Sequence, residues 1–325
     1  MRALVCGAYG PIDNLEIRDW TMPSLKPDEV QLEVHAGGVN FPDGLMVQGK
    51  YQVKPDLPFV AGGECAGIIR KVGDAVKGFQ VGDRVIAIPG IAAFAESVNV
   101  DHKLLMPMPA ELDFPQAAGF CITYATSYYA FKQRAQLKEG ETLVVLGAAG
   151  GVGVTAIQLG KLMGARVIAC ASTDEKLAFC RDLGADETIN YTTENLKDRL
   201  RELTDGKGAD VIYDPVGGDF TEQAYRSIAW GGRYLVIGFA AGAIPKLPLN
   251  LPLLKAGDIL GIYWGGWAAR DPKGNMQNFS ELLGFVQEGR LQPLTTEVYG
   301  LEDFRKAFTA IDERRARGKV VLTMR

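Results

Sequence analysis

The sequence has few of the residues from which a multi-histidine metal site is built. It contains only two histidines, His35 and His102, and they do not form an HxxxH pair. Its five cysteines are odd in number, and none of them are paired as CxxC. In a chain of this length, that pattern is typical of reduced, mostly buried thiols. A site made of several histidines is therefore excluded.

Long apolar runs and a strong charge imbalance are also absent. No segment approaches the roughly 18 consecutive apolar residues that a membrane-spanning helix requires. The N-terminus MRALVCGAYG lacks a long apolar core and predicts a first strand, so no signal peptide is expected. A net charge of -4 and a pI of about 5.4 argue against a nucleic-acid-binding protein. We interpret the short basic stretch 314–319 as a solvated helix end, and we expect a soluble, cytoplasmic protein.

The 325 residues predict two domains, because one hydrophobic core seldom grows so large. Up to about residue 120, short β-rich runs alternate with Gly and Pro, as in an irregular barrel. Beyond it, strand-like and helix-like segments alternate, which indicates a parallel sheet with helices on both faces. The final strand VVLTM is expected to return to the first domain. The predicted helices are 151–163, 174–183, 194–203, 220–229, 278–288 and 301–313.

The segment TLVVLGAAGGVGVTAIQLGKLMG (142–164) is the strongest chemical signal. A buried strand leads into a glycine-rich turn and then into an amphipathic helix. Gly147 suits the tight turn, and Gly150 and Gly151 let the backbone approach a pyrophosphate, while Gly153 allows the helix to pack closely on the sheet. The phosphates are expected at the helix N-terminus. The predicted cofactor-binding residues of this turn are Gly147, Ala149, Gly150, Gly151, Val152 and Gly153.

The end of the next strand indicates which dinucleotide is bound. An NAD site usually has Asp or Glu there for the ribose 2′-hydroxyl, whereas this strand ends in Ala171-Ser172-Thr173. The Ser172 hydroxyl can donate to a 2′-phosphate, and Lys176 can neutralise it. Asp174 and Glu175 follow in the first turn of the next helix, where we interpret them as capping and dipole partners. NADPH is therefore favoured over NADH.

The whole chain resembles the quinone oxidoreductase branch of the medium-chain dehydrogenase/reductase superfamily. The segments that carry the resemblance are GVNFPDGLMVQGKY (38–51), FVAGGECAG (59–67), GDRV (82–85), ITYATSYYA (122–130), GAAGGVG (147–153), DVIYDPVGG (210–218) and GFAAGAIPKLPLNLPLLK (238–255). The resemblance implies an α/β fold in which a Rossmann-type doubly wound parallel sheet (121–264) is inserted in a GroES-like irregular β-barrel (1–120 and 265–325). It also implies a homodimer that reduces quinones or other conjugated carbonyl compounds with NADPH and without zinc.

Carried over by position, the resemblance assigns roles to individual residues. Asn40, Asp43, Tyr51 and Thr126 match residues near the nicotinamide and the acceptor. The predicted 2′-phosphate contacts are Lys176 and Tyr191, and further cofactor contacts are Val216, Gly238, Phe239 and Ala240.

Structural alternatives remain open for the four catalytic candidates. Asn40 and Asp43 are suited to a turn or to the cap of a short helix. Tyr51 is equally suited to aromatic packing, and Thr126 to a buried bond with a backbone carbonyl.

These observations predict direct hydride transfer from NADPH to an acceptor held between the two domains, with polar groups stabilising the anion that forms. One alternative is a reductase of enoyl thioesters or enones on the same scaffold. A second alternative is a protein that binds or senses NADPH without turnover.

The pair Glu64-Cys65 in PFVAGGECAG suggests either half of a zinc site or a tight turn. In the zinc-binding relatives, the resemblance aligns a metal-binding histidine with Gly63, and a cysteine near Asn40 is absent as well. Zinc needs four ligands, or three and a water, which Glu64 and Cys65 cannot supply alone. No metal is therefore expected.

Overall fold

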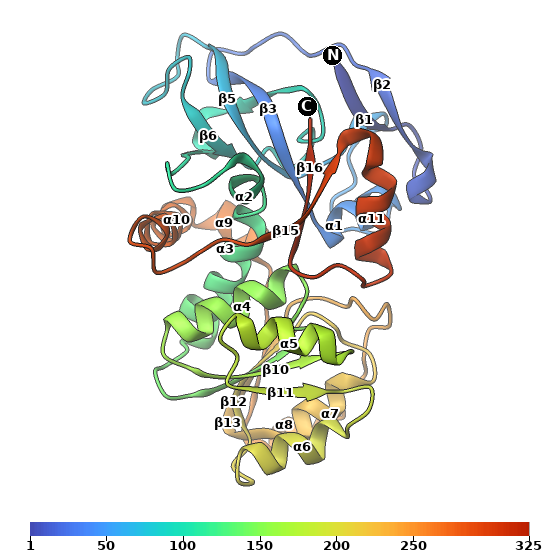
Figure 1. Ribbon diagram of the computed structural model, residues 1–325, viewed down its shortest axis with the longest axis vertical. Coiled ribbons are helices and arrows are strands. Elements are labelled where there is room, and N and C mark those ends of the chain that lie inside the picture. The colour runs from blue at the N-terminus through green and yellow to red at the C-terminus, as the bar shows by residue number, and fades with distance from the viewer. Residues whose placement is uncertain (325) are drawn as a thin grey trace. The chain divides into compact units, whose positions relative to one another are not determined.

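The structure, a computed structural model, describes residues 1–324 and divides into two compact units (Figure 1). The first unit contains Met1–Ile122 and the chain from Gln292 onward, and the second contains Thr123–Leu291. Residues 265–291, expected in the barrel domain, thus belong to the second unit. The reason is that Glu281, on α10 (Pro272–Gln287), accepts hydrogen bonds of 2.6 Å from both Tyr128 and Lys132 of that unit.

The first unit is built on a seven-stranded sheet. Strand β3 (Glu29–Val39) alternates buried and half-buried residues over most of its length, which is the period-two pattern of a strand with one face on the core. The last strand, β16 (Lys319–Thr323), pairs antiparallel with β3, so the predicted return of the C-terminus is confirmed. The spatial order is β15 (Thr295–Gly300), β16 (Lys319–Thr323), β3, β5 (Glu64–Val72), β6 (Arg84–Ala87) and β8 (Leu105–Pro107), with β7 (Ser97–Asp101) on β3.

A second, three-stranded sheet and short helices complete this unit. Glu64 and Cys65 do not form the tight turn that was one of the two alternatives, because both residues open strand β5, where they are completely buried. The strands of the smaller sheet are β2 (Leu15–Asp19), β1 (Arg2–Cys6) and β4 (Phe59–Val60), and the helices are α1 (Phe41–Val47), α2 (Phe114–Ala118) and α11 (Phe304–Asp312).

The second unit contains a parallel sheet, as predicted, and this sheet has six strands. Its central strand β9 is buried along nearly its whole length, which is expected when helices cover both faces of a sheet. The spatial order is β11 (Glu187–Asn190), β10 (Arg166–Ala171), β9 (Thr142–Leu146), β12 (Ala209–Asp214), β13 (Ile228–Val236) and β14 (Asp258–Gly261).

Most helices of this unit lie close to their predicted bounds, with two clear differences. The helix expected at 278–288 already begins at Pro272, because the Asp271 side chain caps it by accepting from the Gly274 N–H. The helix expected at 220–229 ends at Arg226, because Ile228 already pairs with Ala209 in the sheet. The helices are α3 (Cys121–Tyr129), which continues as a π-helical segment (Ala130–Ala135), α4 (Gly151–Leu162), α5 (Asp174–Asp182), α6 (Leu196–Leu203), α7 (Phe220–Arg226), α8 (Asn250–Lys255), α9 (Trp264–Arg270) and α10.

In the first unit, the helix predicted at 301–313 consists of a 3-10 turn (Leu301–Asp303) followed by α11. Nowhere in residues 1–324 is there a helix long and apolar enough to span a membrane.

Candidate functional site

The turn after β9 has the geometry of a phosphate-binding loop. Gly147 has a φ of +56°, a conformation that glycine adopts without strain. A Cβ on Gly153 would lie 2.4 Å from the Gly147 carbonyl oxygen, so only glycine fits there. Gly150 is the N-cap of α4, whose first N–H groups have no partner within the helix. The loop therefore offers an open backbone and free N–H groups to an anion.

Close packing of α4 against the strands depends on a different glycine from the one predicted. The missing Cβ of Gly153 faces carbonyl oxygens of the turn itself. A Cβ on Gly160 would lie 2.6 Å from the Leu143 side chain on β9 and 3.1 Å from that of Val167 on β10. Gly160 thus allows the helix to lie on the sheet, and Gly153 shapes the turn.

Val216 covers the glycine turn from the neighbouring strand. A Cβ on Gly147 would lie 2.8 Å from Val216 Cγ2. The loop that carries Val216 is held by the buried carboxylate of Asp214, whose Oδ1 accepts the backbone N–H groups of Val216 (2.7 Å) and Gly217 (2.9 Å). Asp214 Oδ2 accepts hydrogen bonds from Thr221 and Tyr234. Asp214 is therefore a structural residue that positions a predicted cofactor contact.

Gly238, Phe239 and Ala240 follow the next strand and belong to the same edge. The backbone N–H of Ala240 donates to the Pro215 carbonyl at 3.0 Å, and that of Gly238 to the Asp214 carbonyl at 3.4 Å. The two loops are thus fastened to each other. The structure brings these three predicted residues next to Val216.

The strand order explains why this edge suits a ligand. The chain runs outward from β9 to β10 and β11, and then returns to place β12 on the other side of β9. Ligands of open α/β sheets bind at the carboxyl ends of strands where the order reverses in this way. Gly147 follows β9 and Val216 follows β12, so they flank that switch point.

Three predicted 2′-phosphate residues meet at the ends of β10 and β11. Lys176 Nζ lies 3.4 Å from Ser172 Oγ. The backbone N–H of Tyr191 donates to the Ala171 carbonyl at 3.2 Å, and the Tyr191 ring packs 4.4 Å from that of Phe220. The arrangement places an ammonium beside a hydroxyl, and both groups are able to donate hydrogen bonds to an anion.

Thr126 lies half-buried on α3, and its neighbours make the prominent polar contacts of that helix. Ser127 Oγ lies 2.8 Å from both Thr155 Oγ1 on α4 and Tyr213 Oη on β12. Thr155 also donates to the Thr123 carbonyl at 3.2 Å. This buried hydroxyl network ties α3 to the helix that carries the glycine turn. The catalytic assignment of Thr126 itself stays a prediction.

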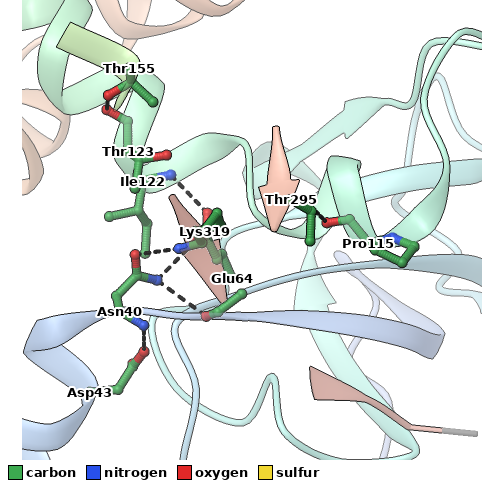
Figure 2. Close-up of polar contacts among 10 residues, drawn as sticks. Asn40, Asp43, Glu64, Pro115, Ile122, Thr123, Thr155, Thr295 and Lys319 are labelled. Carbon is green, nitrogen blue, oxygen red and sulfur yellow. Dashed lines mark hydrogen bonds and ion pairs between the residues drawn. The ribbon is translucent and has the colours of Figure 1, made fainter. Parts of the chain in front are cut away.

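The first unit holds a buried polar cluster made from Asn40, Glu64 and Lys319 (Figure 2). Lys319 Nζ lies 2.6 Å from Asn40 Oδ1 and 2.7 Å from Glu64 Oε1. Asn40 Nδ2 donates to the same Glu64 oxygen at 2.9 Å, and the Ile122 N–H donates to Glu64 Oε2 at 2.8 Å. Both oxygens of the Glu64 carboxylate are therefore occupied from within this unit.

Asp43 adjoins the cluster at the start of α1. Its Oδ2 accepts the backbone N–H of Asn40 at 2.7 Å, so the predicted capping function of Asp43 is confirmed. Burial raises the pKa of Asp43 to about 7, which the Asn40 N–H and the positive charge of Lys319 only partly oppose. A carboxyl group with this pKa is able to hold or release a proton near neutral pH.

Tyr51 and the histidines lie outside the described bonds of this cluster. Tyr51 is partly buried and packs against the core of the first unit, so the packing alternative is confirmed, and its assignment to the acceptor stays a prediction. The His35 ring stacks 4.1 Å from that of Phe114, and His102 Nδ1 lies 2.9 Å from the Asp28 carbonyl oxygen.

Comparison with known proteins agrees with this architecture. Residues 26–110 match the family described as "Alcohol dehydrogenase GroES-like domain", and residues 151–286 match that described as "Zinc-binding dehydrogenase". A quinone oxidoreductase-like protein 2 homolog of Nematostella vectensis is 39% identical over 325 residues, which cover 99% of this chain and 88% of that relative. The chain belongs to the quinone oxidoreductase branch of the medium-chain dehydrogenase/reductase superfamily. The predicted family and fold are confirmed.

Solved structures include two instructive members of the same superfamily. Escherichia coli quinone oxidoreductase, complexed with NADPH, is similar with a TM-score of 0.93 at 29% identity, over 99% of this chain and 100% of that one. The CurK enoyl reductase is similar with a TM-score of 0.91 at 26% identity, over 100% of this chain and 99% of that one. A quinone oxidoreductase and an enoyl reductase therefore both have this fold.

The side chains around Glu64 and Cys65 in this chain do not fit a zinc ion. Among residues 1–324, no three His, Cys, Asp or Glu side chains form a group able to hold a metal ion. The Glu64 carboxylate already binds an ammonium, and burial raises the pKa of the Cys65 thiol far above its usual range. A buried thiol that keeps its proton is a poor metal ligand.

Lys319 is the member of this buried cluster that sequence reasoning missed. It is only 5% exposed, whereas lysine is almost never buried unless it is paired. Its partners lie far away in the sequence, and no local pattern links them. One feature of the sequence does indicate a partner for Lys319. It is the first residue of the strand KVVLT, and a lysine that opens a strand of buried residues needs a partner.

Proposed function

We propose that this protein is an NADPH-dependent oxidoreductase that transfers a hydride to a quinone or a similar conjugated carbonyl compound, without zinc. The observation that carries the proposal is the carboxyl edge of the parallel sheet. There, the glycine turn, the free N–H groups of α4 and the Lys176–Ser172 pair lie at successive strand ends. The NADPH complex of the Escherichia coli relative supports the choice of cofactor.

The residues of this edge fit the parts of the cofactor. The N–H groups of Gly151, Val152 and Gly153, in the first turn of α4, would hold the pyrophosphate. Lys176 and Ser172 would bind the 2′-phosphate, and Tyr191 would pack beside it. Val216 and the loop of Gly238 would orient the far end. NADPH, when bound, supplies a hydride with two electrons.

The buried cluster of the first unit supports zinc independence. Catalytic zinc polarises a carbonyl as a Lewis acid and needs an open position beside three protein ligands. Here Glu64 is committed to Lys319, Asn40 and the Ile122 N–H. Both oxygens of this carboxylate are thus already bound within the chain, and neither is left to hold a metal ion.

The proposal is tested by a screen of NADPH oxidation against quinones, enones and 2-enoyl thioesters, with metal analysis of the purified protein. We expect turnover with quinones or enones, less with NADH, and no stoichiometric zinc. Tight NADPH binding with no oxidation across the panel would instead support a sensor. Stoichiometric zinc needed for turnover would refute the zinc-free mechanism.

An enoyl reductase is the second candidate function, because the likeness to the CurK enoyl reductase extends over the whole chain. Both reactions deliver a hydride to a conjugated system, so the same cofactor edge serves either one. A strong preference for enoyl thioesters in the screen decides in favour of this alternative.

We also propose a homodimer, formed through the edge strand β14. This strand ends the parallel sheet and offers unpaired backbone groups. In the segment 244–263, which contains this strand, large apolar side chains are 44% to 81% exposed, namely Ile244, Leu249, Leu253, Leu254, Ile259 and Tyr263. A patch of this kind favours an interface.

Light scattering should give twice the chain mass, and the double substitution Leu253→Glu/Ile259→Glu should give a monomer. The cytoplasmic location stays a prediction.

A further inference from the structure

The Asn40 side chain has no hydrogen to spare for an acceptor. An amide group carries two N–H donors. One of those of Asn40 donates to Glu64 Oε1 at 2.9 Å, and the other to the Gly38 carbonyl at 3.2 Å. Asn40 could therefore donate to a bound molecule only by breaking an internal bond. The anion that the sequence analysis expects Asn40 to stabilise must therefore be stabilised by another donor.

Lys319 is the side chain of this cluster that has a donor left. An ammonium carries three N–H donors, and Lys319 uses two of them, for Asn40 Oδ1 and Glu64 Oε1. Within residues 1–324, its third N–H has no hydrogen-bond partner. The nearby N–H of Ile122 is already bound to Glu64. Lys319, and not Asn40, therefore has an N–H left to donate to a bound molecule.

Two glycines and two partners fix the Lys319 ammonium in place. A Cβ on Gly119 would lie 2.6 Å from Lys319 Cγ, so the lysine stem crosses directly over this glycine. A Cβ on Gly38 would lie 2.5 Å from Glu64 Oε1, so the carboxylate also needs a glycine beside it. A side chain that is usually flexible is thereby held in one position, as preorganised stabilisation of an anion requires.

We propose that Lys319 donates its third N–H to the acceptor oxygen that becomes negative during reduction, and that Asn40 and Glu64 position it. The inference rests on the proposed function. Addition of a hydride to a quinone or enone forms a C–H bond and moves an electron pair onto the carbonyl oxygen. A proton from water then completes the product. Because Lys319 is buried, its bond to that oxyanion is stronger than the same bond in water.

Chemical rescue of Lys319→Ala tests the donor directly. We expect kcat/KM to fall by about 100-fold or more, the cost of losing one oxyanion donor. Propylammonium replaces the lost stem and its N–H groups, so it should restore much of the rate. Tetramethylammonium supplies the charge without an N–H, so it should not restore the rate. Equal rescue by tetramethylammonium, or an unchanged kcat/KM, overturns the inference.

A second variant guards against misfolding, because Lys319→Ala leaves the buried Glu64 carboxylate alone. Lys319→Met/Glu64→Gln keeps the stem and removes both charges. Its NADPH affinity should stay close to that of the wild type, since the predicted pyrophosphate and 2′-phosphate contacts lie in the other unit. Its kcat should fall like that of Lys319→Ala. A folded double variant with wild-type kcat/KM also overturns the inference.

Binding of 4-nitrophenol separates this inference from the proposed function, because it needs no turnover. The ionised form of this phenol is coloured and stands in for the anionic oxygen. The wild type should bind the phenolate and lower its apparent pKa, and Lys319→Met/Glu64→Gln should not. If no acceptor is reduced but this difference is found, the proposed function fails and the oxyanion site remains. If both proteins bind phenolate equally, the inference fails.

Discussion

The Lys319 ammonium lies 2.7 Å from Glu64 Oε1, although 255 residues separate the two in the sequence. The pair joins β16, at the C-terminus, to the start of β5. Both side chains are almost completely buried. Removal of one partner from a buried ion pair leaves a charge without compensation, whereas removal of both charges does not. Removal of one charge of this pair should therefore lower the stability more than removal of both charges.

We predict that Lys319→Met lowers the free energy of unfolding by about 3–5 kcal/mol, the usual cost of a buried charge that has lost its partner. Lys319→Met/Glu64→Gln should regain most of that loss, because the glutamine needs no counter-charge. Urea unfolding of the three proteins measures the effect. Equal destabilisation of the single and double variants would mean that the charge pair does not govern stability here.

Gly119→Ala tests the space under the lysine stem. The new Cβ would meet Lys319 Cγ at 2.6 Å, so we expect a loss of about 1–3 kcal/mol in unfolding free energy, as is usual for overpacking.

Gly284→Ala is the matched control for this change. Gly284 lies within α10, and a Cβ there would meet nothing within 4 Å. Alanine in a helix is favoured over glycine by about 1 kcal/mol, so the control should be stabilising. Thermal unfolding midpoints that shift in the same direction for both variants would contradict the packing argument.

The parallel sheet and its glycine turn were predictable because their causes are local. The buried strand, the turn and the helix around Gly147 are contiguous, and each has its own pattern. The elements α8, β14 and α9 were missed. Pro252 lies inside α8, glycines interrupt α9, and the exposed apolar residues of this region follow no strand or helix period. Such segments depend on tertiary or intermolecular contacts that the sequence does not display.

In the first unit, by contrast, the contacts of the buried cluster join residues that lie far apart in the sequence. The resemblance predicted Asn40 and Asp43 as site residues, and the structure does place them together. It could not reveal that the Asn40 amide is fully occupied, because that depends on Lys319, which arrives from the other end of the chain. The hydrogen-bond partners of a side chain depend on the folded structure, whereas a sequence motif supplies only residue types.

Asp43→Asn should change how stability depends on pH. Because burial raises the pKa of Asp43 to about 7 in the folded protein, the folded state holds a proton there that the unfolded state has released above pH 4 or so. The contribution of Asp43 to stability is therefore full below about pH 4 and is lost as the pH rises to 7.

The wild type should thus lose up to about 4 kcal/mol relative to Asp43→Asn between pH 4 and pH 8, since each pKa unit corresponds to about 1.4 kcal/mol. The asparagine still offers an oxygen to the Asn40 N–H. Urea unfolding at several pH values measures the difference, with the exposed Asp74→Asn as control. Parallel curves for the wild type and Asp43→Asn would show that Asp43 is already ionised at low pH.

Lys176→Ala should weaken the binding of NADPH and leave that of NADH unchanged. The Lys176 ammonium lies 3.4 Å from Ser172 Oγ at the end of β10, where we expect the 2′-phosphate, the group that NADH lacks. A hydrogen bond to a charged group contributes about 1.5–3 kcal/mol, so the NADPH dissociation constant should rise roughly 10- to 100-fold. Fluorescence titration with both nucleotides, at constant ionic strength, measures the two constants. The control is Lys207→Ala, an exposed lysine that precedes β12 and so lies at the opposite edge of the sheet. A loss of equal size for NADH and NADPH would mean that Lys176 acts on the fold of α5, because only a contact with the 2′-phosphate distinguishes the two nucleotides.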